Sequence, residues 1–245
     1  QIVGSAINFQ ALIRGSSLLK VKFHNYRVDY RVILQLVRIG LPASIAATER
    51  TSAQLILLRL VTPFGDVALA AYTLTRRFEM FANFGSMGIG QSSGILAGQN
   101  LGAGRPDRAR QAVLWGLVYV TGIIGALASV LLIFPVAIIS FFTNSPEVIA
   151  LAVDWLRIVA IGFVFMSFGM VFQQSFNTAG DTIAPMIFTL IALWGMELPL
   201  AWLFAYSLDI GPLGFAYARV IAMASRLFLY VPYFFWGRWL RLKVF

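Results

Sequence analysis

The chain has 245 residues, of which 59% are hydrophobic and only 12% are charged, and its formal net charge is +9. A soluble globular domain carries about 25% charged residues, so this composition excludes that class and indicates a membrane protein. The basic residues stand between hydrophobic runs and do not form one patch, which argues against nucleic acid as a partner.

The first segment, residues 1–19, is apolar and helix-like, and it begins without methionine. It is shorter than the roughly 20 apolar residues that a helix needs to cross a bilayer. It also lacks the charged start and cleavage site of a signal peptide. We interpret it as the end of a truncated transmembrane helix, followed by a polar, basic connector at residues 20–31 that we expect in the cytoplasm.

Residues 32–237 contain six hydrophobic segments, each long enough to span a bilayer. We place them at about 32–61, 67–101, 109–139, 147–178, 182–208 and 212–237. Their short connectors carry helix-boundary residues, such as Pro146 after Ser145 and the pair Gly180-Asp181, where we expect Asp181 to cap the next helix. The sequence therefore predicts an all-α integral membrane protein with a bundle of six transmembrane helices.

The connectors alternate in charge along the chain, except for the turn at 179–182, which is uninformative. Those at 20–31 and 105–110 are rich in lysine and arginine, as is the tail at 238–245, whereas those at 62–66, 144–147 and 208–212 have neither. By the positive-inside rule, the basic set and the C-terminus face the cytoplasm of a multi-pass protein in the cell membrane. We expect the aromatic residues at the last helix end to form an interfacial belt; they are Tyr233, Phe234, Phe235, Trp236 and Trp239.

Four glycines recur at intervals of four in the second segment, at Gly90, Gly94, Gly98 and Gly102. On a helix this interval places them on one narrow face without side-chain bulk. Membrane helices associate by close backbone approach over such small residues. We therefore predict that this helix packs tightly against a neighbour and ends at the basic loop that follows.

Several runs carry a resemblance to a known family. The stretch from Gly40-Leu41-Pro42 through ALAAYTLTRRFE to GIGQSSGILAGQNLGAGRPDRAR resembles the C-terminal lobe of multidrug and toxic compound extrusion (MATE) transporters. The later runs LRIVAIGFVFMSFGMVFQQSFNTAGDT, LWGMELPLAW and IGPLGFAYARV are similar to that family in the same order. The resemblance implies twelve helices in two lobes of six. This chain would supply the second lobe and the end of a preceding helix, and the N-terminal lobe of the same protein would be missing.

The same resemblance implies export of cationic or amphipathic compounds in exchange for Na⁺ or H⁺. Sodium-coupled members carry one acid on the first helix of this lobe and another on the fourth. Here Glu49 stands near the first position, but Met166 and Ser167 stand where the second acid is expected. We therefore expect either proton coupling or sodium coupling through residues of the missing lobe.

The ionisable residues within the predicted helices are candidate functional groups, because a charge in a bilayer is costly unless it is paired or hydrated. Glu49 and Glu79 both lie about 20 Å along their helices from a shared short loop, at nearly the depth of Arg50, Arg76 and Arg77. One interpretation is that these groups form ion pairs that hold the hairpin together, and we expect one arginine within salt-bridge range of an acid. The other is that one acid faces a cavity and receives a cation or a proton.

Four further residues have open interpretations. Asn83 continues the polar face that Glu79 begins. Glu197 precedes Pro199, whose missing N–H frees a backbone carbonyl, so the pair suits either a cation site or a packing kink. Gln173 and Gln174 line a cavity or form hydrogen bonds between helices.

No catalytic, phosphate-binding or metal-binding motif is visible, so we predict neither an enzyme nor a metal site. The predicted function is secondary-active multidrug efflux by alternating access, coupled to H⁺ or Na⁺, with small organic cations and membrane lipid as partners. The alternatives are a flippase of lipid-linked precursors with a related fold, and a purely structural half. A flippase would show several arginines or lysines converging in its cavity.

Overall fold

The computed structural model describes residues 30–240, apart from the side chains at positions 32, 35, 38, 39, 43, 46, 47 and 50. The interpretations of residues 1–19, of most of the 20–31 connector and of residues 241–245 lie outside this range. The chain divides into two units, Gln1–Arg38 and Ile39–Phe245, and the packing below is that of the second unit.

The described residues are helical almost throughout. In chain order the elements are α2 (Tyr30–Val61), η1 (Thr62–Phe64), α3 (Asp66–Gly102), α4 (Pro106–Ile133), α5 (Pro135–Ser140), α6 (Pro146–Thr178), α7 (Ile183–Leu190), η2 (Ile191–Glu197), α8 (Leu198–Trp202), η3 (Leu203–Ser207), α9 (Leu213–Trp236) and η4 (Arg238–Leu240). Elements α7 to η3 follow one another without a break, so six long helical segments correspond to the six predicted ones and confirm the all-α membrane fold.

Four of these segments are apolar and long enough to cross a membrane: α4, α6, Ile183–Ser207 and α9. The sequence predicted six spans, and the two others are α2 and α3. Both carry charged groups in their middle, including Glu49 in α2 and Arg76, Arg77 and Glu79 in α3. The less apolar character of α2 and α3 follows from these residues, of which Arg76, Arg77 and Glu79 line one pocket.

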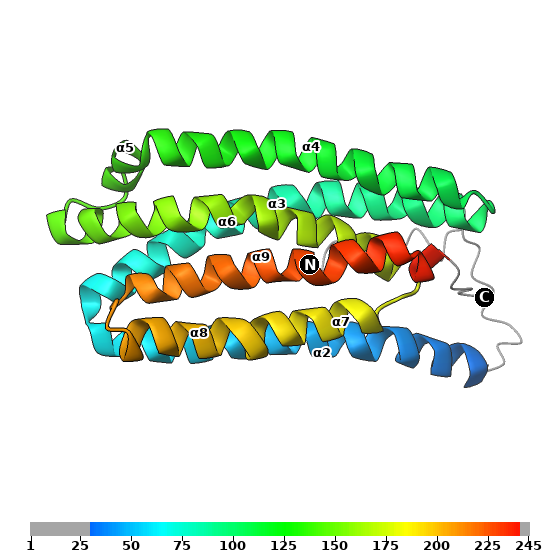
Figure 1. Cartoon of the computed structure of the whole chain (residues 1–245), viewed down its shortest axis with the longest axis horizontal. Helices are drawn as coiled ribbons and strands as arrows, with labels where there is room; N and C mark the ends of the chain where they lie inside the picture. Colours follow the sequence, from blue (N-terminus) through cyan, green and yellow to red (C-terminus); the bar gives the residue numbers. More distant parts are fainter. Residues whose placement is uncertain (1–29, 241–245) are drawn as a thin grey trace, which may run out of the picture. The chain divides into compact units, whose positions relative to one another are not determined.

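Helix α6 is the centre of the bundle, where it packs against α3, α4 and α9 (Figure 1). Three glycines of α3 face it. A Cβ atom added to Gly94 would lie 2.8 Å from the carbonyl oxygen of Gln174, and one added to Gly90 would lie 3.2 Å from that of Met170. Gly98 faces Thr178 in the same way, whereas a Cβ at Gly102 would meet nothing within 4 Å.

Small residues also set the contact between α3 and α4. The hydroxyl of Ser93 donates a hydrogen bond of 2.8 Å to the carbonyl oxygen of Ala112. A Cβ added to Gly116 would overlap that same hydroxyl. The glycine therefore keeps α4 close enough for the polar link between the two helices.

An aromatic cluster fills the space between the ends of α6 and α9. Phe172 and Phe234 lie 5.3 Å apart between ring centroids, and Phe176 and Trp239 lie 5.5 Å apart. Phe234, Trp239 and Tyr233 are thus buried, so the predicted interfacial belt is wrong for these three residues. The other two members, Phe235 and Trp236, are exposed. The rotation of α9 about its axis turns one side of this aromatic run into the core.

The turn between α6 and α7 is tied to α9. Gly180 adopts the left-handed conformation, with φ of 85°, which favours glycine. Asp181 accepts a hydrogen bond from the backbone N–H of Ala184 at 3.3 Å and another from the hydroxyl of Tyr233. The residue directly before α7 is Thr182 and not Asp181, so the predicted cap is displaced by one residue although the carboxylate still holds the first turn.

The fifth segment is irregular around Pro199. Its stretches Ile191–Glu197 and Leu203–Ser207 are π-helical, with Leu198–Trp202 as an α-helical turn between them. Proline has no N–H for the ladder, and such insertions are a common response to the missing hydrogen bond. The wide turn ends at Glu197, which places this acid at the point where the helix changes its winding.

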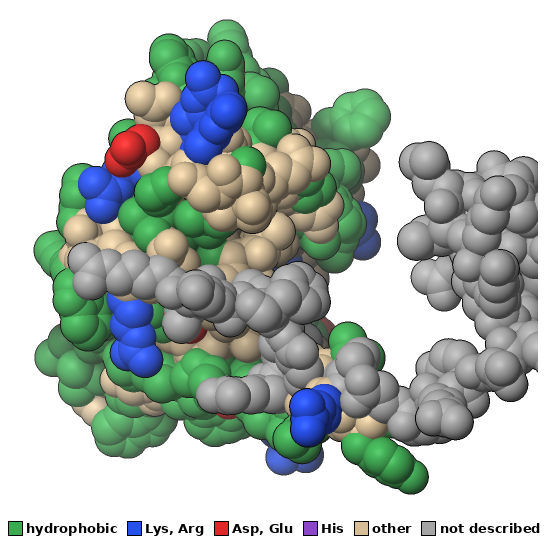
Figure 2. Space-filling view, turned by 90° about the vertical axis from the view of Figure 1, so that its right-hand side faces the viewer, with side chains coloured by type: hydrophobic (Ala, Val, Ile, Leu, Met, Phe, Trp, Pro, Cys, Tyr) green, Lys and Arg blue, Asp and Glu red, His purple; other side chains and the backbone are tan. Residues whose placement is uncertain are grey.

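The two ends of the bundle differ in charge. The end at which α3 leads into α4 carries the exposed Arg105 and Arg108, and Arg238 is exposed after α9. Figure 2 looks at this end and shows several basic side chains spread over apolar surface, with few acidic ones. The connectors at the opposite end, 62–66 and 208–212, contain no lysine or arginine.

Candidate functional site

A single open pocket dominates the described part of the second unit, with a volume of about 510 Å³. Residues of α2, α3, α6, η2 and α9 line it. Its charged lining residues are Arg76, Arg77, Glu79, Glu197, Arg219 and Arg226. Sites for small organic molecules commonly have about 300–1,000 Å³, so the pocket is large enough for a drug-sized ligand.

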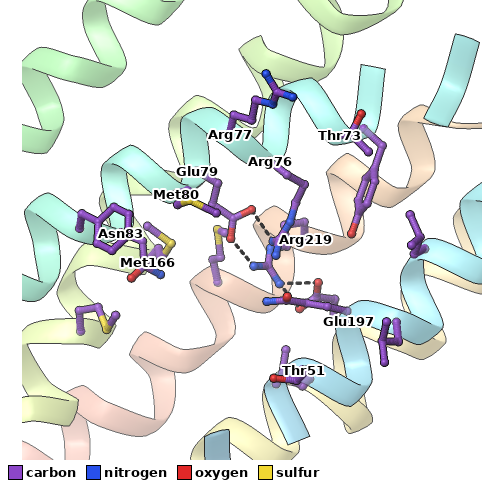
Figure 3. A pocket seen from close by; sticks show the side chains of 18 of the residues that line it. Thr51, Thr73, Arg76, Arg77, Glu79, Met80, Asn83, Met166, Glu197 and Arg219 are labelled. Carbon is purple, nitrogen blue, oxygen red and sulfur yellow. Dashed lines mark hydrogen bonds and ion pairs between the residues drawn. The ribbon is translucent and has the colours of Figure 1, made fainter. Parts of the chain in front are cut away.

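A network of ion pairs crosses this pocket from α3 to η2 (Figure 3). The Nη1 atom of Arg219 donates to both carboxylate oxygens of Glu197, at 2.6 and 2.8 Å. Its Nη2 atom donates to Glu79. Arg76 donates to the other oxygen of Glu79 at 2.8 Å. Three separate elements, α3, η2 and α9, are therefore joined by four side chains with no net charge.

Both carboxylates of the network are withdrawn from solvent, with 7% of Glu79 and 2% of Glu197 exposed. Buried charges of one sign repel each other strongly where the dielectric constant is low. The guanidinium of Arg219 lies between the two acids and neutralises them. It thus occupies the position that a free cation would take between the same carboxylates.

Local sequence explains how these groups meet. Arg76 and Glu79 are three residues apart and share one face of α3. Glu197 stands at the end of the π-helical turn before Pro199. Arg219 is brought in by the close approach of α9 to η3, because a Cβ at Gly214 would lie only 2.7 Å from the backbone nitrogen of Ala205.

The remaining walls of the pocket are largely apolar. Methionines supply much of this surface, at Met80, Met166, Met170 and Met223. Methionine side chains are flexible and polarizable, so they adapt to ligands of different shape. Met166 occupies one of the two positions where a sodium-coupled pattern requires an acid, and Ser167 beside it is buried and donates to the carbonyl of Val164 at 2.7 Å.

Four of the site residues proposed from sequence line the pocket: Glu79, Asn83, Gln173 and Glu197. Gln174 lies instead at the contact between α6 and α3, beside Gly90. Glu49 is not among the lining residues, and its Oε2 atom is buried without a hydrogen-bond partner among the described groups. The structure thus brings the acids of α3 and η2 together and leaves the acid of α2 apart.

The predicted ion pair between a helix arginine and an acid is present as Arg76–Glu79 at 2.8 Å. The side chain of Arg50, the other arginine in that prediction, lies outside the described atoms. Arg219 was missed, although it is the central group of the network. The sequence signal was available, since it is the first charged residue of an otherwise apolar segment, seven residues after Pro212.

Metal ligation has no support in the described residues, which contain no group of three or more His, Cys, Asp or Glu positioned to hold an ion. The two carboxylates of the pocket lining are instead paired with Arg76 and Arg219. Its lining is suited to bind an organic molecule reversibly, through apolar walls and a few fixed charges.

Long apolar helices around an open, partly charged pocket define the class of membrane transporters. The MatE family model matches residues 42–203, and the chain belongs to this family. It is 30% identical over 196 residues to the uncharacterized transporter YisQ of Bacillus subtilis, covering 80% of this chain and 42% of that protein. It is 25% identical over 210 residues to the probable multidrug resistance protein YoeA of the same organism, covering 85% and 45%.

Solved structures show the same fold. A MATE structure in the bent conformation superposes with a TM-score of 0.87 at 19% identity, covering 97% of this chain and 52% of that one. A Pyrococcus furiosus transporter of the MOP superfamily, described as having a binding pocket of reverse polarity, gives 0.72 at 22% identity, covering 86% and 45%. The chain thus spans about half the length of the relatives it matches. The family to which it belongs is one of transporters and not of enzymes.

Proposed function

We propose that the protein containing this chain is a secondary-active exporter of amphipathic compounds, and that this chain forms one of its two lobes. The observation that carries the proposal is the open pocket of about 510 Å³, lined by methionines and by a fixed charge network, in a MatE-family lobe. The name of YoeA, a probable multidrug resistance protein, supports the same class of function. The other lobe of the transporter would be the N-terminal one, because this chain resembles the C-terminal lobe and spans about half the length of its relatives.

Alternating access supplies the mechanism, in which the two lobes rock against each other around a central site. The ion pairs that join α3, η2 and α9 favour movement of this lobe as one body. A ligand in the pocket would then be exposed to one side of the membrane at a time. The apolar walls account for the hydrophobic part of such amphipathic substrates.

The coupling ion is proposed to be H⁺, or Na⁺ bound by residues of the other lobe. Within the described part of this lobe, the acids Glu79 and Glu197 are already neutralised by Arg219. A sodium ion would have to displace that guanidinium to reach both carboxylates. Glu49, Glu79 and Glu197 would in this account adjust the electrostatics of the cavity without carrying the essential ion.

We propose a multi-pass location in the cell membrane with the C-terminus in the cytoplasm. The support is the asymmetry of the two bundle ends, one with Arg105, Arg108 and Arg238 and the other with connectors that lack basic residues. Exposed apolar side chains along α4, such as Val118 and Ile123, would face lipid.

The second candidate function, a flippase of lipid-linked precursors, gains one specific observation. The described lining of the pocket includes four arginines and only two glutamates. The Pyrococcus furiosus transporter, described as having a binding pocket of reverse polarity, shows that this fold can hold pockets of different charge. A phosphate headgroup would be met by such an excess of arginine.

Transport by the protein expressed from its full gene, in proteoliposomes, tests the proposal. A panel of fluorescent amphipathic compounds of both charges is loaded, and its movement is followed after a pH or sodium gradient is imposed. Gradient-driven transport of at least one compound supports the exporter. Movement of a fluorescent lipid headgroup between leaflets, without transport of any free compound, supports the flippase instead.

A further inference from the structure

The charged side chains of the pocket differ in whether they already form ion pairs. Glu79 accepts from both Arg76 and Arg219, and Glu197 accepts both of its hydrogen bonds from Arg219. Every carboxylate in the described lining is therefore already neutralised by arginine. A cationic ligand would have to break one of these ion pairs to gain a charged partner here, and breaking a buried pair is costly.

Arg77, unlike these two carboxylates, forms no ion pair with a described side chain. It lines the pocket from α3 and its side chain is exposed. Figure 3 shows it extending away from Glu79 and Glu197, while its neighbour Arg76 points to Glu79. Among the described side chains, none forms an ion pair or hydrogen bond with Arg77. An arginine within a membrane-spanning segment is unfavourable unless it is hydrated or paired, so a counter-charge is expected for it.

We propose that this pocket binds its amphipathic ligand through an anionic group held by Arg77, with the apolar body of the ligand against the methionine wall. This inference rests on the proposed function and names the substrate class of the same site. The guanidinium of Arg77 offers the forked donors that match carboxylate, sulfonate and phosphate oxygens.

The apolar half of the binding mode follows from the arrangement of the lining. Met166, Met170 and Met223 are buried residues of α6 and α9, whereas Arg77 belongs to α3. A ligand with its anionic group at Arg77 therefore has a polar end on one helix and an adaptable apolar surface on two others. The anionic group can belong to a free amphipathic acid or to a lipid headgroup, and both share this chemistry.

The test uses two probes of matched size and opposite charge, tetraphenylborate and tetraphenylphosphonium. Their binding to the full-length protein in detergent is measured by equilibrium dialysis. Tetraphenylborate accepts no hydrogen bond from a guanidinium, so it probes the positive charge of Arg77 alone. We expect it to bind more tightly than the phosphonium by about tenfold, the scale of one close interaction between opposite charges. Equal affinity of the two probes, or tighter binding of the phosphonium, overturns the inference.

Variants of Arg77 locate the effect. Arg77→Gln should lower the affinity for tetraphenylborate by about tenfold and leave that for the phosphonium nearly unchanged, and Arg77→Lys should restore most of the loss. Because Arg77 is exposed and makes no described polar contact, its replacement should not unfold the protein. Arg157→Gln, at an exposed arginine outside the pocket, is the matched control. Unchanged tetraphenylborate binding in Arg77→Gln overturns the proposal.

Competition by short-chain lipids separates the two sources of the anion. Displacement of tetraphenylborate by dioctanoyl phosphatidylglycerol, but not by dioctanoyl phosphatidylcholine, supports an anionic lipid headgroup. Failure of both lipids, with Arg77-dependent tetraphenylborate binding intact, supports a free amphipathic acid. Since binding is measured without a gradient, this experiment can succeed even where the transport assay fails. A protein that transports compounds but binds the phosphonium more tightly would refute the anionic substrate and leave the proposed exporter function intact.

Discussion

Arg219 of α9 and Glu197 of η2 form a forked ion pair in which one guanidinium nitrogen, Nη1, contacts both carboxylate oxygens, at 2.6 and 2.8 Å. The other terminal nitrogen of Arg219 reaches Glu79 on α3. One side chain thus neutralises acids from two different elements. The stability of this lobe and the polarity of its pocket both depend on it.

Replacing Arg219 should therefore be strongly destabilising. Arg219→Gln leaves two withdrawn carboxylates without their shared counter-charge, which should cost about 3–5 kcal/mol. The measurement is the apparent melting temperature of the full-length protein in detergent. The double variant Arg219→Gln with Glu197→Gln should be more stable than the single one, because one uncompensated charge is removed. Additive losses would show that the two residues do not interact.

The glycines of α3 should differ in their tolerance of a methyl group. Gly94→Ala forces a Cβ atom against the carbonyl of Gln174 and should destabilise the contact with α6 by about 1–3 kcal/mol. Gly102→Ala is the control, since a Cβ there meets nothing within 4 Å. The melting temperatures of both variants are measured by thermal unfolding, and that of Gly94→Ala should be the lower one. Equal melting temperatures would mean that α3 and α6 are not in close contact at Gly94.

The hydrogen bond between Tyr233 and Asp181 should contribute to the junction of α7 and α9. Tyr233→Phe keeps the ring in the aromatic cluster and removes only the hydroxyl, so the buried carboxylate loses a donor at a cost of about 1–3 kcal/mol. Tyr119→Phe, on the exposed face of α4, provides the comparison. A loss of stability in Tyr119→Phe as large as that in Tyr233→Phe would remove support for this contact.

Neutral replacements of the acids test the coupling ion. Glu49→Gln and Glu79→Gln keep the side-chain shape and remove the charge, and each should reduce gradient-driven efflux only in part. Glu79→Gln should have the larger effect, because its acid lies in the pocket and pairs with two arginines. Complete loss of a sodium-driven efflux in Glu49→Gln would place the essential ion in this lobe.

Sequence periodicity was sufficient for the helices and for part of the site. The spacing of Glu79 and Asn83 placed both on the polar face of α3, where they do line the pocket. The four-residue interval of the glycines predicted a packing face, and Pro199 predicted an irregular helix. Each of these features depends on residues within one helix, so its pattern is visible in the sequence.

Contacts between helices could not be read in the same way. Arg219 meets an acid 140 residues away, and only the rotation and tilt of α9 bring the two together. The same rotation buries Tyr233 and Phe234, which composition alone placed at the membrane interface. Glu49 matched the expected depth of Glu79, yet it does not line the described pocket. Depth along a helix is set by sequence, whereas the direction of a side chain around it is set by packing.

The most direct test of the central claim, that this pocket is the transport site, is thiol labelling at Asn83. These 245 residues contain no cysteine, so Asn83→Cys introduces one reactive group within them, beside Glu79 in the pocket lining. A membrane-impermeant maleimide is added to membrane vesicles of either orientation. It should label this position from a side of the membrane that depends on the imposed gradient. A transported compound should slow the labelling. Ser140→Cys, at the exposed end of α5, should be insensitive to both. Labelling of Asn83→Cys that responds neither to the gradient nor to any transported compound would contradict the account.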